Sequence, residues 1–428
     1  MKTIFYPERK DWATLCARPE VDAESLDEVC AGVFREVREN GDEALRKYTR
    51  QFDRADIDRF EVREEEFAEA QRAVPQDLKD AIRVAKANIE AFHRLQSPQA
   101  VRWDSPDGFV CQQRAVPIGR VGIYVPGGSA PLFSTVLMLA VPARIAGCGQ
   151  VVMCTPPSPD GRVNPAVLWA ARLCGVDKVF KVGGIQAIAA MTFGTQTVPK
   201  VYKLFGPGNR YVMAAKQYAL NWGVAIDMPA GPSEVLVVAD RSARADFVAA
   251  DLLSQAEHGP DSQVVLLTDQ ADFPQAVAAE IEKQLACLPR RGMAEKALEN
   301  SRMIVMEDLE RCMDFSNEYA PEHLILCTED CAERAGRVTD AGSVFLGNYS
   351  PESAGDYASG TNHTLPTSAY ARSYSGVNVD AFVKKITFQQ ISPQGLAALG
   401  PVIETMAGAE ELSAHKNAVT IRLKTLEK

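Results

Sequence analysis

The chain has 428 residues, of which 46% are hydrophobic and 24% are charged, and its formal net charge is −10. This length and composition are typical of a soluble enzyme with about two to four domains. The negative charge and the absence of a basic run argue against partners such as nucleic acid or an anionic membrane. The first ten residues lack the apolar core of a signal peptide, and proline and polar residues interrupt the most apolar stretch, 130–148. That stretch is predicted to be a buried helix and not a membrane span.

The ten cysteines are scattered along the chain and form no C-x-x-C motif. This pattern predicts reduced, mostly buried thiols in a cytoplasmic protein. Cys148, between Gly147 and Gly149, is the one candidate nucleophile, although core packing is the favoured role. The sequence assigns no function to Cys111.

The first hundred residues are predicted to be helical. The sequence 25–28 has a capping-box pattern, apolar residues then recur at helical spacing, and Gly41 ends the helix. Two more helices are predicted at 64–74 and 75–93. His93 lies on the second of these without a neighbouring carboxylate or glycine, so no function is assigned to it.

From about residue 117, short apolar runs rich in β-branched residues alternate with helical patterns. Strands are predicted at 122–126, 150–154, 178–182, 201–205, 235–238, 264–267, 303–306, 324–327 and 343–346. Helices are predicted between them at 136–145, 163–174, 186–191, 209–222, 245–255, 273–285, 309–319 and 331–338. Strands that are apolar throughout indicate parallel sheets covered on both faces. Two such α/β units favour a two-domain enzyme with a cleft, followed after about residue 382 by a helical tail with little core of its own.

Glycine-rich turns follow several of these strands, at 126–128, 183–186, 206–209 and 230–233. Such turns let a backbone approach a phosphate or a flat ligand, although any parallel sheet needs tight connections. No G-x-G-x-x-G fingerprint is present, because Val152 and Tyr211 stand where the third glycine would be. The chain also lacks a Walker A loop and a G-x-S-x-G elbow, which argues against a P-loop NTPase and an ordinary serine hydrolase.

Histidine is scarce, with five in the whole chain, and two of them follow a glutamate, in Glu257-His258 and Glu322-His323. Imidazole is well suited to bind a transition metal or to move protons near neutral pH. Scarce histidines beside carboxylates favour a metal site or an acid-base site over ordinary surface or core histidines.

Gln255 and His258 are three residues apart at the end of a predicted helix, which puts both on one face. A helical pair can form a zinc site with ligands from distant loops, and Asp356, in a loop of small residues predicted to be flexible, and His415 are candidates. Each has an alternative role. Gln255 is an uncommon zinc ligand and could satisfy backbone carbonyls, Asp356 could form a turn beside Gly355, and His415 could be a partly exposed histidine.

Glu322 and His323 open a predicted strand directly after Pro321. Adjacent residues of a strand point to opposite faces, but at the start of a strand both side chains can reach a common cleft. A carboxylate beside an imidazole can activate water or relay a proton. The alternative is a pair at the end of a strand with no role.

Several segments in one order resemble the histidinol dehydrogenase family, between about Gly119 and His415. They are 121–128, 205–209, 228–234, 254–258, 319–324 and 359–367. The resemblance implies an α/β fold of two related α/β/α units with mostly parallel sheets, incomplete Rossmann-like and aldehyde-dehydrogenase-like in character, plus helical N- and C-terminal segments. We therefore expect a first α/β domain at 1–118 and 235–381, a second, nucleotide-contacting one at 119–234, and a helical tail at 382–428 that packs on the partner subunit.

The resemblance also implies an activity: NAD-dependent and zinc-dependent four-electron oxidation of L-histidinol to L-histidine through L-histidinaldehyde, the last steps of histidine biosynthesis. Family members are homodimers with shared active sites. One zinc ion per subunit is expected on Gln255, His258, Asp356 and His415. His323 is expected as the base and Glu322 as the residue that activates water.

Substrate contacts are implied for Ser233, Gln255, His258, Glu322, His323, Asp356, Glu410 and His415. Nicotinamide-nucleotide contacts are implied for Tyr124, Gln186 and Asn209. No role is assigned to His363.

Three other functions stay open. A relative could oxidise another small polar alcohol such as a sulfonated diol, although the Glu410 carboxylate favours the cationic histidinol. A zinc hydrolase could use Glu322 with metal-bound water. A non-catalytic binding protein is disfavoured because all four ligand residue types are present.

Overall fold

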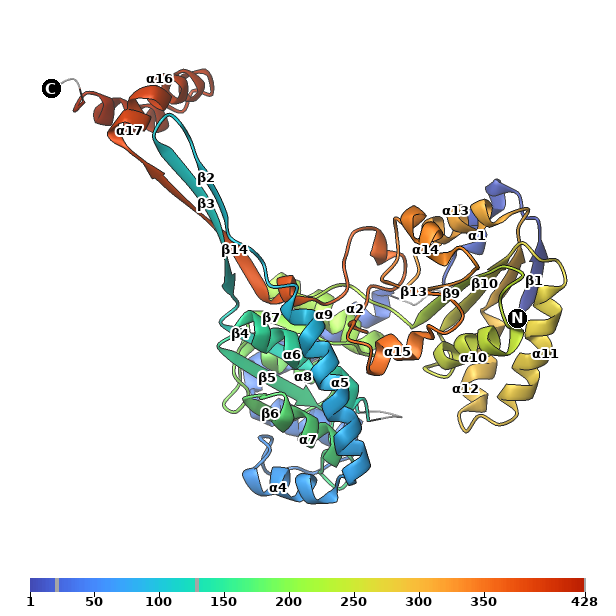
Figure 1. Ribbon diagram of the computed structural model, residues 1–428. Coiled ribbons are helices and arrows are strands. Elements are labelled where there is room, and N and C mark those ends of the chain that lie inside the picture. Colours follow the sequence, from blue (N-terminus) through green and yellow to red (C-terminus); the bar gives the residue numbers. More distant parts are fainter. Residues whose placement is uncertain (20–22, 128–130, 427–428) are drawn as a thin grey trace. The chain divides into compact units, whose positions relative to one another are not determined.

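The computed structural model describes residues 1–19, 23–127 and 131–426, and it forms two compact units (Figure 1). The first unit comprises Met1–Gln96 and Ile118–Phe382, and the second comprises Ser97–Pro117 and Val383–Lys428. The first unit contains two parallel sheets flanked by helices, which confirms the predicted α/β class. Among the described helices, none combines the length and the apolar character needed to cross a membrane.

A six-stranded parallel sheet lies in the first unit, with strand order β1-β11-β10-β9-β12-β13. Its strands are β1 (Lys2–Phe5), β9 (Glu234–Ala239), β10 (Gln263–Thr268), β11 (Arg302–Val305), β12 (His323–Cys327) and β13 (Ser343–Leu346). The principal helices around it are α10 (Ala245–Ala256), α11 (Phe273–Leu285), α12 (Arg291–Glu299), α13 (Leu309–Tyr319) and α14 (Cys331–Arg334). Successive side chains of β9 enter two cores, since Val235 and Val237 pack on the α10 side while Leu236 and Val238 pack with Trp12 and α13.

A five-stranded parallel sheet has the strand order β6-β5-β4-β7-β8. Its strands are β4 (Arg120–Tyr124), β5 (Gln150–Thr155), β6 (Lys178–Lys181), β7 (Lys203–Phe205) and β8 (Ala225–Ile226). One face is covered by α5 (Gln76–Arg94), α6 (Phe133–Ala146) and α7 (Pro165–Leu173), which run side by side (Figure 1). The other face is covered by α2 (Ala23–Asn40), α3 (Asp42–Tyr48), α8 (Gly184–Phe193) and α9 (Arg210–Ala219).

The two sheets share one topology. Apart from β1, which adds an edge strand beside β11, each sheet has its first strand in the middle, the next two on one side and the last two on the other. The point where the order reverses falls between β9 and β12 in one sheet and between β4 and β7 in the other. In open α/β sheets, ligands bind at such switch points, beyond the carboxyl ends of the strands.

The second unit is built from antiparallel strands and two helices. β3 (Phe109–Pro117) pairs with β2 (Val101–Asp104) and with β14 (Val383–Ile391). α16 (Pro393–Ala409) and α17 (Ser413–Leu423) pack together, and a Cβ added at Gly400 would lie 2.7 Å from Leu423. None of the described residues of α17 is buried, so this helix has little core.

Every strand predicted between 122 and 346 is present with small shifts at its ends. Several elements differ from expectation, among them β2, β3 and β8, which were not predicted. β1 interrupts the helical N-terminus because it pairs with β11 and forms the edge of the six-stranded sheet. α12 was not predicted, and β14 replaces the first part of the predicted helical tail because it completes the sheet of β2 and β3. α15 (Glu352–Tyr357) replaces the predicted flexible loop.

The predicted division into domains stays a prediction. The structure adds that α2 contacts α8 and α9, that α4 (Glu64–Ala73) contacts α7, and that α5 contacts α6. Gly128, in one predicted glycine-rich turn, lies outside the described residues, as does the side chain of Ser25 in the predicted capping box.

Candidate active site

Glu322 and His323 lie where they were predicted, at the amino end of β12. His323 pairs in register with Val235, so the start of β12 lies beside the start of β9. Glu322 Oε2 accepts a hydrogen bond from the Glu234 backbone N–H (2.8 Å), and Nδ1 of His323 lies 3.0 Å from the Glu234 carbonyl oxygen. A carbonyl oxygen only accepts, so Nδ1 carries a hydrogen and Nε2 is the nitrogen left for proton transfer.

Asp356 faces this nitrogen, with its Oδ1 3.4 Å from His323 Nε2. The prediction that Asp356 lies in a flexible loop is wrong, because it belongs to α15. Gly355 allows this helix to approach β13, since a Cβ at that position would lie 2.8 Å from the ring of Phe345. The helix therefore holds the Asp356 carboxylate against the imidazole.

Gln255 lies in the last turn of α10 and His258 in the turn that follows. The Gln255 amide nitrogen donates to Glu352 Oε2, and its Oε1 is buried without a hydrogen-bond partner. The pKa of His258 is lowered, mainly by burial, while the charge of Asp356 acts in the opposite direction. Both predicted ligands from the end of α10 thus lie near Asp356.

The ionisable groups of this cluster are strongly perturbed. Burial raises the pKa of Glu322, and burial raises that of Glu352 to about 8. Burial disfavours a charged His323, but the Glu322 and Asp356 carboxylates raise its pKa well above the usual value. Burial also opposes ionisation of Asp356, yet the His323 ring lowers its pKa. The Asp356 carboxylate thus keeps its charge beside the imidazole, and the Glu322 and Glu352 carboxyls can release their protons when a cation binds.

The donor atoms also fit a cation. Ligand atoms of His323, Glu352 and Asp356 lie within 4.8 Å of one another. Three buried polar atoms here lack hydrogen-bond partners: Oε1 of Gln255, Nε2 of His323 and Oδ1 of Asp356. Buried polar atoms normally have partners, so these three indicate room for a metal ion or a polar substrate.

The structure does not gather every predicted residue into this cluster. Glu410 directly follows α16 and His415 lies on α17, both exposed and both in the second unit. Ser233 directly precedes β9, next to the Glu234 backbone that contacts Glu322 and His323.

Two buried glutamates escaped the sequence analysis. Glu234 forms a two-pronged ion pair with Arg18 (2.9 and 3.0 Å), which fixes the start of β9. Glu352 follows Pro351 in a segment that looked like a loop. The sequence positions of these glutamates could have identified them. Glu234 ends the segment 228–234, which carries part of the family resemblance, and Glu352 precedes Asp356 by one helical turn.

The two remaining histidines have structural contacts. In His363, Nδ1 lies 2.9 Å from the Asp356 carbonyl oxygen and Nε2 lies 3.2 Å from Thr135 Oγ1. Burial lowers its pKa, so the neutral ring donates to the carbonyl and accepts from the threonine. His93 is fully buried and contacts the Ile89 carbonyl and the Asn362 amide, which is consistent with no assigned function.

The predicted cofactor residues lie at the carboxyl edge of the five-stranded sheet. Tyr124 ends β4, Gln186 lies in the first turn of α8, and Asn209 caps α9, with its Oδ1 accepting from the backbone N–H of Tyr211 and Val212. Tyr124 and Asn209 thus flank the switch point between β4 and β7. This is where a dinucleotide binds in related topologies.

Gly206 shapes this switch point. Its φ is +130°, and a Cβ there would lie 2.2 Å from the Tyr124 carbonyl oxygen. Its N–H donates to Asp227 Oδ2 and its carbonyl accepts from Lys216 Nζ, both at 2.8 Å, and the Lys216 and Asp227 side chains are fully buried as an ion pair. The ion pair therefore holds the glycine turn on both sides.

The turn between β6 and α8 brings Gln186 near a further carboxylate. The Gly184 N–H donates to the Tyr124 hydroxyl (3.1 Å), and the Gln186 amide nitrogen lies 3.5 Å from Asp53 Oδ2. Gln186 is fully buried, and its Oε1 has no hydrogen-bond partner. Burial raises the pKa of Asp53 to about 6. An unsatisfied amide oxygen here fits a ligand donor such as a carboxamide or a hydroxyl group.

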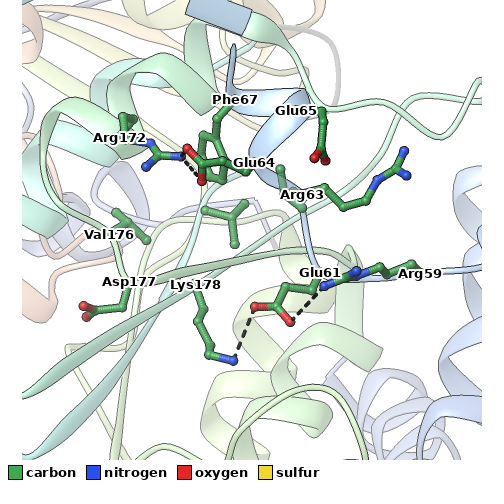
Figure 2. A pocket seen from close by; sticks show the side chains of 12 residues that line it. Arg59, Glu61, Arg63, Glu64, Glu65, Phe67, Arg172, Val176, Asp177 and Lys178 are labelled. Carbon is green, nitrogen blue, oxygen red and sulfur yellow. Dashed lines mark hydrogen bonds and ion pairs between the residues drawn. The ribbon is translucent and has the colours of Figure 1, made fainter. Parts of the chain in front are cut away.

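Another hollow lies on the first unit, with a volume of about 570 Å3, lined by residues of α4, α7 and β6 and by the segment before α4 (Figure 2). Its charged side chains pair among themselves, as Lys178 does with Glu61 (3.3 Å) and Arg172 with Glu64. None of the predicted site residues lines it.

All ten cysteines are free thiols, as predicted. Burial raises the pKa of Cys148 to about 11, and its sulfur contacts the Phe382 carbonyl oxygen, which supports core packing over nucleophilic chemistry.

Comparison with known proteins adds independent evidence. Residues 16–423 match the family model of histidinol dehydrogenase. Histidinol dehydrogenase of Bacteroides fragilis is 55% identical over 428 residues, covering 100% of both chains. That of Escherichia coli K12 is 53% identical over 416 residues, covering 96% of this chain and 95% of the relative.

Solved structures agree. The crystal structure of histidinol dehydrogenase from Elizabethkingia anophelis has a TM-score of 0.97 and 54% identity, covering 100% of this chain and 99% of the other. An acetylating aldehyde dehydrogenase from Geobacillus thermoglucosidasius, 14% identical, has a TM-score of 0.50 and covers 90% of this chain and 94% of the other, so it shares the fold alone. Together with the sequence matches, these findings place the chain in the histidinol dehydrogenase family of oxidoreductases.

Proposed function

We propose that the chain oxidises L-histidinol to L-histidine through L-histidinaldehyde, using NAD and one zinc ion per subunit. Family membership supports oxidation of histidinol in histidine biosynthesis. One observation carries the proposal: the buried Glu322–His323 pair faces unsatisfied ligand atoms of Gln255 and Asp356. An acid-base pair beside a cation site is what oxidation of a bound amino alcohol requires.

The proposed zinc ligands are Gln255, His258, Asp356 and His415. When bound, the cation supplies a fixed positive centre for the imidazole and amine nitrogens of the substrate, which positions the carbinol carbon. The unsatisfied oxygens of Gln255 and Asp356 support this assignment. Ser233, Glu322, His323 and Glu410 are the further substrate contacts, and the Glu410 carboxylate suits a cationic substrate.

NAD is proposed to bind at the carboxyl edge of the five-stranded sheet, on Tyr124, Gln186 and Asn209. When bound, it supplies the acceptor for one hydride in each of the two oxidations. The switch point beside Tyr124 and the unsatisfied Gln186 oxygen support this location.

His323 acts as the base in the first oxidation. Its Nδ1 is held by the Glu234 carbonyl, so Nε2 takes the proton of the substrate hydroxyl as the carbinol carbon loses a hydride. The carboxylates within 3.5 Å raise the pKa of the ring and so stabilise the imidazolium that forms. A cation held by Asp356 would offset this effect and keep the ring neutral before the reaction. The product of this step is the aldehyde.

Glu322 acts in the second oxidation. It removes a proton from the water that attacks the aldehyde carbon, and the resulting hydrate loses a second hydride to give the carboxylic acid. Burial raises the pKa of Glu322 towards neutrality, which makes it a better base than an exposed glutamate. The hydrogen bond from the Glu234 N–H orients its carboxylate beside His323.

The protein is further proposed to be a cytoplasmic homodimer in which Glu410 and His415 complete the partner's site. Exposed apolar side chains of the second unit support a covering partner, among them Trp103, Phe388, Val402, Met406 and Ile421. The free cysteines support the cytoplasm.

The decisive experiment measures NADH formation from L-histidinol with the full-length protein, before and after chelation and after zinc is restored. Two NADH per histidinol, lost on chelation and recovered with zinc, are expected. A sulfonated diol is the comparison substrate. Preferential oxidation of the sulfonated diol would identify the related alcohol dehydrogenase. No NADH from either alcohol would contradict a dehydrogenase and leave the zinc hydrolase.

A substitution separates the two oxidations. Glu322→Gln is expected to keep NADH formation from histidinol in the first step and to slow oxidation of added histidinaldehyde. Normal aldehyde oxidation by this variant would show that Glu322 does not activate the water.

Mixed dimers test the shared site. His323→Ala and His415→Ala should each be inactive alone, whereas an equal mixture that has exchanged subunits should regain about a quarter of the wild-type activity, because half of the dimers then carry one intact site. Sedimentation confirms the dimer, and no recovery after proven exchange contradicts a shared site.

A further inference from the structure

Glu352 has no assigned role, yet it contacts two consecutive residues of α10. It lies in the first turn of α15 and is 1% exposed. Ser254 Oγ lies 2.7 Å from its Oε1 and 2.7 Å from the Asp251 carbonyl oxygen, and the Gln255 amide nitrogen donates to its Oε2. Both oxygens of one buried carboxylate therefore hold the end of α10.

The bond to Gln255 determines which way the amide points. An amide has an NH2 group that only donates and an oxygen that only accepts, so Oε2 of Glu352, the accepting oxygen of this carboxyl, can bind the NH2 side alone. With NH2 facing Glu352, the Gln255 oxygen must point away from it. That oxygen is buried and unsatisfied, as is Oδ1 of Asp356 one helical turn after Glu352.

We propose that Glu352 is a positioning residue, which orients Gln255 so that Oε1, and not the NH2 group, faces the cation. The inference rests on the proposed zinc site and deepens it. Glutamine is a weak and uncommon zinc ligand, and an unrestrained amide would rotate between two orientations of which only one binds a cation. Partners that orient ligands in this way commonly contribute ten- to hundredfold to metal affinity.

The rival role is direct ligation, since a Glu352 oxygen lies within 4.8 Å of the ligand atoms of His323 and Asp356. The two roles differ in what they need from the side chain. Orientation needs a hydrogen-bond acceptor at this position, whereas ligation needs the negative charge. Glu352→Gln keeps an acceptor oxygen and removes the charge, while Glu352→Ala removes both.

The experiment measures zinc affinity of the full-length protein by competition with a chromophoric chelator, without NAD or substrate. Glu352→Ala is expected to weaken zinc binding ten- to hundredfold and Glu352→Gln by less than about fivefold, because hydrogen bonds to a neutral acceptor are weaker but keep the orientation. Ser254→Ala, which frees one Glu352 oxygen, is expected to lie between wild type and Glu352→Gln. Glu329→Ala, an exposed glutamate beyond the other end of β12, is the matched control and should leave the affinity unchanged.

Three results overturn the inference. Equal losses in Glu352→Gln and Glu352→Ala would assign Glu352 as a charged ligand, and unchanged affinity in Glu352→Ala would leave it no part in the site. If the wild type binds no zinc, the proposed metal site fails and the inference falls with it. Melting temperatures of the metal-free variants check folding, and if Glu352→Ala does not fold, Glu352→Gln and Ser254→Ala decide between orientation and ligation.

Discussion

Apart from the edge strand β1, the two parallel sheets have the same strand order, but they present opposite edges to the proposed chemistry. In the five-stranded sheet, Tyr124 and Asn209 lie at the carboxyl edge, beside the switch point. In the six-stranded sheet, Glu322 and His323 lie at the amino edge. One topology therefore supports two kinds of site, and the residues just beyond the strands decide which edge is used.

The carboxyl edge of the six-stranded sheet carries none of the proposed site residues, and Asp240 offers a reason. Asp240, directly after β9, accepts hydrogen bonds from the Ser242 N–H (2.8 Å), the Ser242 hydroxyl (2.6 Å) and the Glu329 N–H (2.9 Å). A carboxylate of the chain thus occupies the donors at the switch point between β9 and β12, where a phosphate would bind. In the five-stranded sheet, the backbone N–H after β7 donates to Asp227, which follows β8 and forms an ion pair with Lys216.

The largest effect should come from disabling the amino edge. His323→Asn keeps a donor for the Glu234 carbonyl but removes the basic nitrogen, so kcat should fall by about a hundred- to ten-thousandfold. NAD affinity, measured by fluorescence titration, should stay close to wild type because the cofactor edge is intact. A comparable loss of NAD affinity would mean that the two edges are not separate sites.

Removing the Lys216–Asp227 ion pair at the carboxyl edge of the five-stranded sheet should lower the stability of the protein. Lys216→Met leaves the buried Asp227 carboxylate unpaired and removes the donor to the Gly206 carbonyl, so the free energy of unfolding should fall by about 3–5 kcal/mol. Urea denaturation measures the loss. The double variant Lys216→Met/Asp227→Leu should recover part of it, and no loss in the single variant would show that the turn does not depend on this ion pair.

Asp240→Ala should cost about 1–3 kcal/mol, because the backbone N–H groups of Ser242 and Glu329 lose a charged acceptor at the switch point. Steady-state kinetics should show KM values for NAD and histidinol within about twofold of wild type, since an unused edge contacts neither. A tenfold rise in the KM for NAD would place the cofactor at the six-stranded sheet instead.

The smallest effect concerns α10, which carries Gln255. Burial raises the pKa of Asp251 on this helix from 3.8 to about 7. The folded state thus binds more protons than the unfolded state between these values, so this carboxyl lowers stability as pH rises through that window. Asp251→Asn should stabilise the protein at pH 8, by about 1–2 kcal/mol, and have no such effect near pH 4. Thermal unfolding at the two pH values checks it, and equal effects at both would contradict the role of burial.

The sequence alone predicted the repeating βα pattern because the strands are apolar throughout and the helices periodic. β1 and β14 escaped because their partners, β11 and β3, are distant in the chain and edge pairing leaves no periodic signal. The segment with Asp356 looked like a loop because Ser353, Ala354 and Gly355 are small. Its helix depends on the close approach to Phe345, which only the fold reveals.

The sequence predicted those residues of the candidate site whose side chains are scarce in this chain. Scarce histidines beside glutamates identified His258 and His323, helical spacing from His258 added Gln255, and Asp356 was a candidate carboxylate that the resemblance supported. Glu352 and Glu234 were not found, because buried glutamates look like the many exposed ones until their partners are known. Their roles depend on hydrogen bonds to Gln255 and to Arg18, far away in sequence.

His363 connects α6, which covers the five-stranded sheet, to Asp356 in the site beside the six-stranded sheet. Its ring is held between Thr135 on α6 and the backbone of Asp356 on α15. A shift of α6 would therefore either move the Asp356 backbone or break one of these two hydrogen bonds. Because both ring nitrogens are hydrogen-bonded, a displacement of α6, which packs on the sheet of the proposed nucleotide site, would be transmitted to the backbone of Asp356.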